Sequence, residues 1–257
     1  RKVTAQKIKT AGTTGVLALQ EHGLKEVPDE VFKVVNLRTL NLESNTLRSL
    51  PGAVTSLSKL KTLRVDVNKL ESLPDLSALS ALLDLSARDN RLEGANALGP
   101  LPPSLVKLSL PDNHLGGFPA AVLDGLVSLQ VLDLSANGIR FVPASLSSAL
   151  PALIELSLDS NTIQSLPAEL SDLKKLKKIS LKSNRIEAMH DGKQQSLARE
   201  LFANSTVEVL ELQGNPLTKP ELMHMDDINL FLERRERNKN KNLQGGALLQ
   251  LSVCGLD

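Results

Sequence analysis

The chain has 257 residues, of which 41% are hydrophobic but only 2% are aromatic, with five Phe and neither Trp nor Tyr. Any core must therefore be aliphatic, with leucine as its main component. Thirty Lys and Arg residues against 29 Asp and Glu residues give a net charge of +1, which excludes a global attraction to nucleic acid or to a membrane. A single cysteine, Cys254, excludes an internal disulfide, so we expect an intracellular protein in a reducing compartment, most simply the cytoplasm.

Residues 1–15 are basic and polar, with four cations spread over the first nine residues. We expect a solvated N-terminal cap that contains a short helix around Val3 to Lys9. The alternative is a basic arm that lies on a membrane surface. It is less favoured because the cations are so widely spaced.

The segment from Leu37 to Pro51, LRTLNLESNTLRSLP, defines a pattern that the following residues repeat. It reads LxxLxLxxNxLxxLP, and its asparagine recurs every 22 to 24 residues, with a longer step of 31 before the last copy. The residues at this position are His22, Asn45, Asn68, Asn90, Asn113, Asn137, Asn161, Asn184 and Asn215. A period of this length over residues 16–219 predicts a solenoid that grows along one axis.

Each repeat predicts a short strand, a turn and a return segment. The L-x-L alternation sends the leucines to one face of a strand and the residues between them to the other. An asparagine amide both donates and accepts, so stacked asparagines can satisfy turn backbone that has no sheet partner. The proline of the LP step prevents a second strand, so the chain crosses to the outer side. We therefore predict an α/β solenoid of about nine repeats, with a curved parallel sheet on its concave face and short helices or turns on its convex face.

Two segments interrupt the pattern. Residues 94–103, GANALGPLPP, carry two Gly and three Pro and predict an irregular convex loop. The eighth repeat is longer, and Leu197 and Leu201 lie four residues apart in it. With Asp191 as the expected cap, this spacing predicts a helix on the convex side.

After Asn215 the repeats end, and two further parts follow. Residues 220–237 carry apolar side chains at helical spacing and predict a C-terminal capping helix that covers the last layer of the core. Residues 238–257 consist of a polar linker and an apolar tail. The tail is expected either to fold back on the convex face or to dock on a partner.

A search for catalytic chemistry finds none of the usual motifs. The sequence has no phosphate-binding GxxxxGK, no dinucleotide-binding GxGxxG, no GxSxG and no HExxH. Four histidines without ligand-type spacing and one cysteine do not provide a zinc site. The apolar runs are too short to span a membrane. We predict a protein without enzymatic activity, cofactor, metal site or transmembrane segment.

The concave face remains as the candidate binding surface, because its outward side chains can be assigned to columns. Neighbours in a column lie one strand apart, about 4.8 Å, so Asp66 can meet Arg88 and Asp84 can meet Lys107. Such pairing would give a self-neutralising polar face, whereas the forked donors of Arg64 and Arg88 suit a partner's carboxylates. No aromatic residue lies in the columns, which predicts a broad polar contact. The candidate partner-binding residues are Arg64, Asp66, Asp84, Arg88, Lys107, Asp133, Glu155, Lys178 and Lys182.

A second candidate surface is basic and lies at the C-terminal end of the repeats. It comprises Lys174, Lys175, Lys177, Arg234 and Arg235. A solvated face is the simpler interpretation. The alternative is peripheral contact with an acidic protein, an anionic lipid or an RNA backbone. Without aromatic residues to stack bases, sequence-specific binding of nucleic acid is not expected.

The motif LxxLxLxxNxLxxLP, repeated without cysteine-bonded caps, resembles the small intracellular leucine-rich repeat proteins, including the plant Ras-group and Shoc types. Residues from Thr4 to Phe32 and from Gly214 to Lys241 are similar to the two ends of one subgroup, that of leucine-rich repeat-containing protein fifty-seven and its plant relatives. The resemblance implies a non-enzymatic scaffold or adaptor that binds a protein partner. Two alternatives stay open: a constitutive structural subunit of a large assembly, and a regulatory subunit of a phosphatase or small-GTPase pathway.

Overall fold

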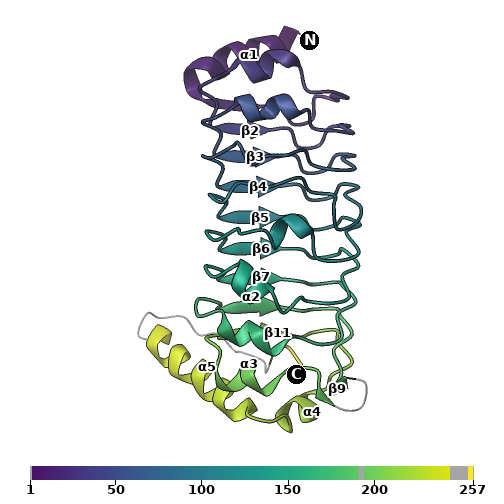
Figure 1. Cartoon of the computed structure of the whole chain (residues 1–257), viewed down its shortest axis with the longest axis vertical. Helices are drawn as coiled ribbons and strands as arrows, with labels where there is room; N and C mark the ends of the chain where they lie inside the picture. Colours follow the sequence, from purple (N-terminus) through teal and green to yellow (C-terminus); the bar gives the residue numbers. More distant parts are fainter. Residues whose placement is uncertain (1, 191–193, 244–253, 257) are drawn as a thin grey trace.

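The computed structural model describes residues 2–190, 194–243 and 254–256 of the chain. Its body is a parallel sheet to which each repeat adds one strand, in chain order (Figure 1). The strands of this sheet are β1 (Val16–Ala18), β2 (Thr39–Asn41), β3 (Thr62–Arg64), β4 (Asp84–Ser86), β5 (Lys107–Ser109), β6 (Val131–Asp133), β7 (Glu155–Ser157), β8 (Lys178–Ser180) and β11 (Val209–Glu211). The predicted solenoid with one strand in each repeat is confirmed.

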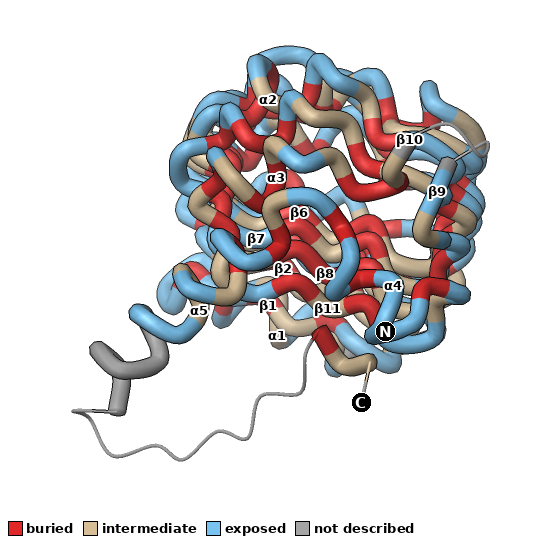
Figure 2. Tube along the Cα trace, turned by 90° about the horizontal axis from the view of Figure 1, so that it is seen from below, coloured by how far each residue is buried: buried red, intermediate tan, exposed pale blue. Residues whose placement is uncertain are grey.

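The strands keep one register along the whole sheet. Val16 pairs with Thr39, Thr39 pairs with Thr62, and the series ends where Lys178 pairs with Val209. The central residue of every strand is a buried leucine or isoleucine. Figure 2, seen along the solenoid, shows buried residues gathered inside the coil, with the strands on one side and the helices α2 (Leu146–Ala149) and α3 (Arg199–Ala203) on the other. The leucine spacing thus placed the core correctly.

A ladder of buried asparagines joins each repeat to the one before it. Asn113, which is 3% exposed, donates from Nδ2 to the carbonyl oxygens of Ala87, Leu110 and Pro111 at 3.0, 3.0 and 3.2 Å. Its Oδ1 accepts from the Leu92 backbone N–H at 3.1 Å. Both groups of the amide are used in the same way by Asn45, Asn68, Asn90, Asn137, Asn161, Asn184 and Asn215. The predicted role of these asparagines is confirmed.

The residue before each turn position adopts a left-handed backbone conformation. In the first eight repeats φ lies between 50° and 59°, at Glu21, Ser44, Val67, Asp89, Asp112, Ala136, Ser160 and Ser183. This conformation costs roughly 1–2 kcal/mol for a residue with a Cβ atom. The ninth repeat has Gly214 at this position, which adopts a positive φ without that cost. The same tight turn therefore follows every strand and brings the next asparagine into the coil.

The return segments lie on the outer side and are short. Several form 3-10 helices that start directly after a proline, whose fixed φ suits a helix start and whose missing N–H is not needed there. These helices are η1 (Asp29–Lys33), η2 (Gly52–Ser56), η3 (Ala120–Val122) and η4 (Ala168–Asp172). Residues 94–103 form no helix, as predicted. There Leu98 bridges to Leu73, and Gly99 lies so close to the Pro74 backbone that a Cβ atom would come within 2.6 Å.

The eighth repeat differs from its prediction. A two-stranded antiparallel ribbon, β9 (Met189–His190) with β10 (Gln194–Gln195), precedes the helix, which begins only at Arg199. Asp191, the expected cap, lies outside the described residues, and Ala198 is the residue that precedes the helix. A helix does form in this repeat, but it begins later than predicted. The reason is that backbone pairing between β9 and β10 occupies residues that the leucine spacing assigned to the helix.

At the N-terminal end, helix α1 (Lys2–Thr14) is longer than the predicted segment and lies across the first repeat (Figure 1). Its Ala11 is fully buried, and Ile8 packs against the core. The Lys7 ammonium donates to the Ala18 carbonyl of β1 at 3.0 Å. The helix therefore covers apolar side chains that would otherwise face solvent at the open end of the coil.

At the C-terminal end, the single helix predicted over residues 220–237 is divided into α4 (Lys219–Met223) and α5 (Ile228–Leu243). Asp227, with φ of 59°, lies directly before α5, where the chain leaves helical geometry. A capping box between Thr218 and Glu221 starts α4. Phe231 of α5 packs on Phe202 of α3 with ring centroids 6.0 Å apart, so α5 covers the last layer of the core.

Arg234 fixes α5 to the last repeat. Its Nε donates to the Val207 carbonyl at 2.8 Å, and its Nη2 donates to the Phe202 carbonyl at 3.1 Å. Burial, and then the charge of Arg237, lower the pKa of Arg234, while Glu208 acts in the opposite direction. This half-buried guanidinium is thus a structural clamp of the cap.

The described part of the apolar tail returns to the body at the last repeat. The backbone N–H of Leu212 donates to the Cys254 carbonyl at 2.9 Å. In earlier repeats the equivalent N–H donates to the following strand, as Leu181 does to Glu211. The described part of the tail therefore lies at the end of the sheet. It does not lie on the convex face, where one of the two predictions had placed it.

Replacing Asn113 by Ala should leave the buried Leu92 N–H without its acceptor and remove one hydrogen bond from each of three carbonyls, which keep their bonds from Asn90, Asn137 and the Asp89 N–H. An unpaired buried N–H costs roughly 1–3 kcal/mol and each lost hydrogen bond about 0.5–1.5 kcal/mol, so we expect a loss of about 3–5 kcal/mol in the free energy of unfolding. Urea denaturation followed by circular dichroism measures this loss. Asn96→Ala is the control, because Asn96 is exposed. Equal stability of the two variants would contradict the structural role of the ladder.

Replacing Arg234 by Ala should loosen the C-terminal cap without unfolding the solenoid. The freed carbonyls and lost packing should cost about 1–3 kcal/mol and speed amide hydrogen exchange in α5. Arg237→Ala, an exposed position on the same helix, serves as control. Unchanged exchange in α5 in the Arg234 variant would show that the clamp is not needed.

Candidate functional site

The concave face presents the outward side chains of the strands in aligned columns. The first and last residues of each strand face this side, while the central residue is buried. Six of the predicted site residues lie on strands, namely Arg64, Asp84, Lys107, Asp133, Glu155 and Lys178, and three lie just beyond them, namely Asp66, Arg88 and Lys182. The sheet therefore brings all nine to one face.

A groove of about 260 Å³ lies over β5 to β11 on this face. Five predicted residues line it, namely Lys107, Asp133, Glu155, Lys178 and Lys182. It is also lined by Val131, Asp159, Glu211 and the serines Ser109, Ser157 and Ser180. The other four, Arg64, Asp66, Asp84 and Arg88, lie on the same sheet outside this groove.

At one end of the groove two lysines share one glutamate. Glu211, which the sequence did not single out, receives Lys178 Nζ at 3.1 Å and Lys182 Nζ at 3.0 Å on its two oxygens. Partial burial acts to raise the pKa of Glu211, but hydrogen bonds from Lys182 and Lys178, the charge of Lys178 and a hydrogen bond from Ser180 outweigh it, so the pKa is lowered from 4.5. Both lysines therefore form ion pairs within the chain.

Two aspartates on this face are held by hydrogen bonds from the next repeat. Asp66 Oδ1 accepts from the Ser86 hydroxyl at 2.6 Å and from the Arg88 backbone N–H at 2.7 Å. Asp159 Oδ1 makes the same pair of bonds, with the Ser180 hydroxyl at 2.6 Å and the Lys182 backbone N–H at 2.8 Å. The same arrangement therefore fixes both carboxylates.

The predicted cross-strand ion pairs are not formed as expected. Arg88 contacts Asp66 through its backbone, while its guanidinium pairs with Asp112, Nε to Oδ2, at 3.2 Å. Asp112 was missed because it lies in the left-handed turn, outside the strand columns. Asp84 and Lys107 are register neighbours on β4 and β5, but no ion pair joins them within the described residues. The self-neutralising ladder is therefore only partly present.

The second, basic surface is also largely paired. Lys177 Nζ lies 2.6 Å from Glu208 Oε1, and Lys174 donates to the Ser171 carbonyl at 3.0 Å. Arg234 is the structural clamp described above, and the Arg235 guanidinium lies 5.6 Å from the Phe231 ring centroid. Lys175 is exposed. These contacts favour the simpler interpretation, and contact with an anionic partner remains a prediction.

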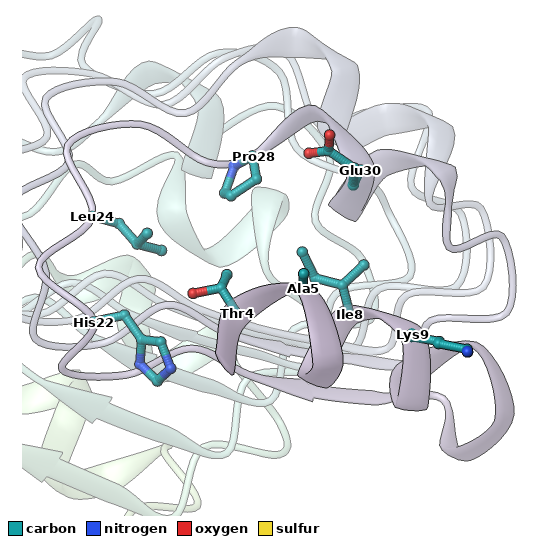
Figure 3. Close-up of a pocket in the computed structure, with 8 residues that line it drawn as sticks. All are labelled: Thr4, Ala5, Ile8, Lys9, His22, Leu24, Pro28 and Glu30. Carbon is teal, nitrogen blue, oxygen red and sulfur yellow. The ribbon is translucent and has the colours of Figure 1, made fainter. Parts of the chain in front are cut away.

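A pocket that the sequence did not reveal lies between α1 and the first repeat. It has a volume of about 630 Å³, and Figure 3 shows Thr4, Ala5, Ile8 and Lys9 of α1 across from His22, Leu24, Pro28 and Glu30. His22, which takes the asparagine position, bonds through Nδ1 to the Gln20 carbonyl at 2.7 Å. The position of α1 against the repeat creates this pocket, and periodicity alone carries no signal for that packing.

The described residues include no group of three or more His, Cys, Asp or Glu side chains placed to hold a metal ion. Within the same part of the chain, none of the helices has the length and apolarity needed to cross a membrane.

Comparisons with known proteins agree with this architecture. The family model described as leucine rich repeat matches residues 15–70 and 128–186. Among solved structures, a TDR receptor is 25% identical with a TM-score of 0.61, over 82% of this chain and 37% of its own. The plant peptide hormone receptor RGFR1 in complex with RGF2 is 25% identical with a TM-score of 0.56, over 75% and 31%.

Human 5T4, also called trophoblast glycoprotein, is 24% identical with a TM-score of 0.64, over 80% of this chain and 79% of its own. This likeness concerns the fold. The chain spans only about a third of the length of the two receptors. No curated protein matches it in sequence. The family match is to a repeat motif and not to a catalytic domain.

Glu211 should make the stability of the last repeats depend on pH. Folding lowers the pKa of this carboxyl, so its ionised form stabilises the native state when the pH is above the pKa of the unfolded chain. This contribution is lost as the pH falls below about 4.5. Thermal unfolding of wild type and Glu211→Gln should therefore differ at neutral pH and converge in acid. A difference that stays constant across this range would contradict the ion-pair account.

Proposed function

Because the chain is a leucine-rich repeat solenoid, we propose that it is a non-enzymatic protein-binding scaffold or adaptor whose concave face contacts an extended segment of a partner. The observation that carries the proposal is the groove over β5 to β11, where aligned polar side chains from successive repeats form one open surface. Such a surface suits a polypeptide that crosses several strands and touches one or two side chains from each.

The similar structures support this use of the fold. The receptor RGFR1 is in complex with RGF2 and is described as a plant peptide hormone receptor. That likeness, at 25% identity, supports binding of a protein or peptide as the general role of this chain. The partner of this chain must be inferred from its own side chains, because the similar structures differ from it in three residues out of four.

We further propose that the chain acts in a reducing compartment, most simply the cytoplasm. The support is its single cysteine, because secreted repeat proteins of small size commonly rely on disulfides. The resemblance of both chain ends to small intracellular repeat proteins points the same way. A regulatory role in a phosphatase or small-GTPase pathway rests only on analogy among proteins of this fold.

A second candidate, a constitutive structural subunit, is favoured by one observation away from the concave face. Phe141 is 70% exposed, in a segment that follows the turn of the sixth repeat. Exposed aromatic side chains commonly mark contact surfaces. In a structural subunit this residue would lie in a permanent interface and the concave groove would remain empty.

Filling the groove with a larger uncharged side chain tests the proposal. Ser109 lies on β5 within the groove, and we expect Ser109→Trp to reduce partner recovery at least about tenfold. The measurement is quantitative affinity purification of the full tagged chain from its own cells, followed by mass spectrometry. Ser72→Trp, at an exposed position away from the strands, should recover the same partners as wild type.

Both variants must first show the thermal stability of the wild type. Loss of partners from Ser109→Trp alone supports binding through the concave face. The same partners in all three samples, retained at high salt in fixed stoichiometry, would contradict it and favour the structural subunit.

A further inference from the structure

The concave face is acidic, although the whole chain carries a net charge of +1. The acidic residues in its three columns are Glu43, Asp66, Asp84, Asp133, Glu155, Asp159 and Glu211, and the basic ones are Arg64, Arg88, Lys107, Lys178 and Lys182. Internal ion pairs hold three of these five cations in place, although Glu211 cancels the charge of only one of its two lysines. Glu211 binds both lysines of the last repeats, and Asp112 binds Arg88.

Seven carboxylates against five cations give the columns a net charge of −2, and Asp112 makes it −3. Among the described residues, six carboxylates of this face have no ion pair, whereas only Arg64 and Lys107 remain without one on the basic side. Hydrogen bonds from serine hydroxyls and backbone N–H groups hold some of these carboxylates but do not cancel their charge. Charges on neighbouring strands lie about 4.8 Å apart, so their fields add over the face.

Two carboxylates without an ion pair in the described part of the chain, Asp133 and Glu155, lie on the same strand as Val131 or on the next one. Asp133, on the same strand, accepts at Oδ1 from the Ser135 backbone N–H at 3.0 Å and from the Ser135 hydroxyl at 2.7 Å, which fixes the carboxylate. Glu155, on the next strand, is exposed and has no ion pair within the described residues. Val131 is half-buried, and its register neighbours on the adjacent strands are Lys107 and Glu155.

We propose that the concave groove binds a basic, extended protein segment, with a Lys or Arg side chain of the partner placed between Asp133 and Glu155. The aliphatic stem of that side chain would lie on Val131 while its charged end reaches the two carboxylates. This inference rests on the proposed function and names the partner class for the same groove. An acidic peptide and a phosphate backbone are disfavoured on this face because its carboxylates repel them.

The test uses the full chain and a library of random dodecapeptides displayed on phage. Selection on the wild-type chain should enrich peptides rich in Lys and Arg. Synthetic copies of the selected peptides should bind at least about tenfold more weakly to Asp133→Asn/Glu155→Gln, which keeps the shape of the groove and removes two charges. Glu26→Gln/Glu71→Gln, which removes two exposed carboxylates elsewhere, should bind within about twofold of wild type.

The outcomes separate this inference from the proposed function. Suppose that Ser109→Trp abolishes binding of the selected peptides, but the peptides are acidic or bind Asp133→Asn/Glu155→Gln as tightly as wild type. Binding through the concave face would then stand, and the inference of a basic partner would be wrong. Peptides that bind equally well to Ser109→Trp would overturn both. Failure to enrich any peptide would also count against both, because a preformed groove for an extended segment should select ligands.

Discussion

The asparagine ladder is the interaction on which the rest of this molecule depends. Strands of three residues satisfy few backbone groups, and the turn that follows each strand would otherwise bury unpaired carbonyls and N–H groups. One amide per repeat, at Asn113 for example, supplies bonds to its own turn and to the repeat before it. Because the bonds join neighbouring repeats, they also fix the spacing and the register of the sheet.

Because the register is fixed, side chains from successive repeats form one continuous surface. Residues that occupy the same position in successive repeats lie side by side, so Asp66 and Asp159 make the same contacts with serine and backbone four repeats apart. The charges of the concave face add for the same reason. The two ends need different solutions, since no further repeat covers them: α1 covers the first layer, and α5 with Arg234 covers the last.

The strands, the core leucines and the columns of the concave face could be predicted from the sequence, because their period is regular. The ion pairs could not. Arg88 pairs with Asp112 because a left-handed turn redirects that aspartate, and Glu211 takes two lysines because a long side chain reaches beyond its own column. The β9–β10 ribbon and the break at Asp227 depend on backbone pairing and on one φ angle, neither of which leaves an apolar period. The acidity of the concave face was hidden by the neutral composition of the chain.

The most direct measurement of the central claim is site-specific photo-cross-linking in cells, with a benzophenone amino acid at position 109 of β5 or at position 141 on the outside. If the concave face is the binding surface, the probe at position 109 should capture a partner through a Lys- or Arg-rich segment, identified by mass spectrometry of the cross-linked peptide. Capture from position 141 alone, with none from position 109, would contradict it.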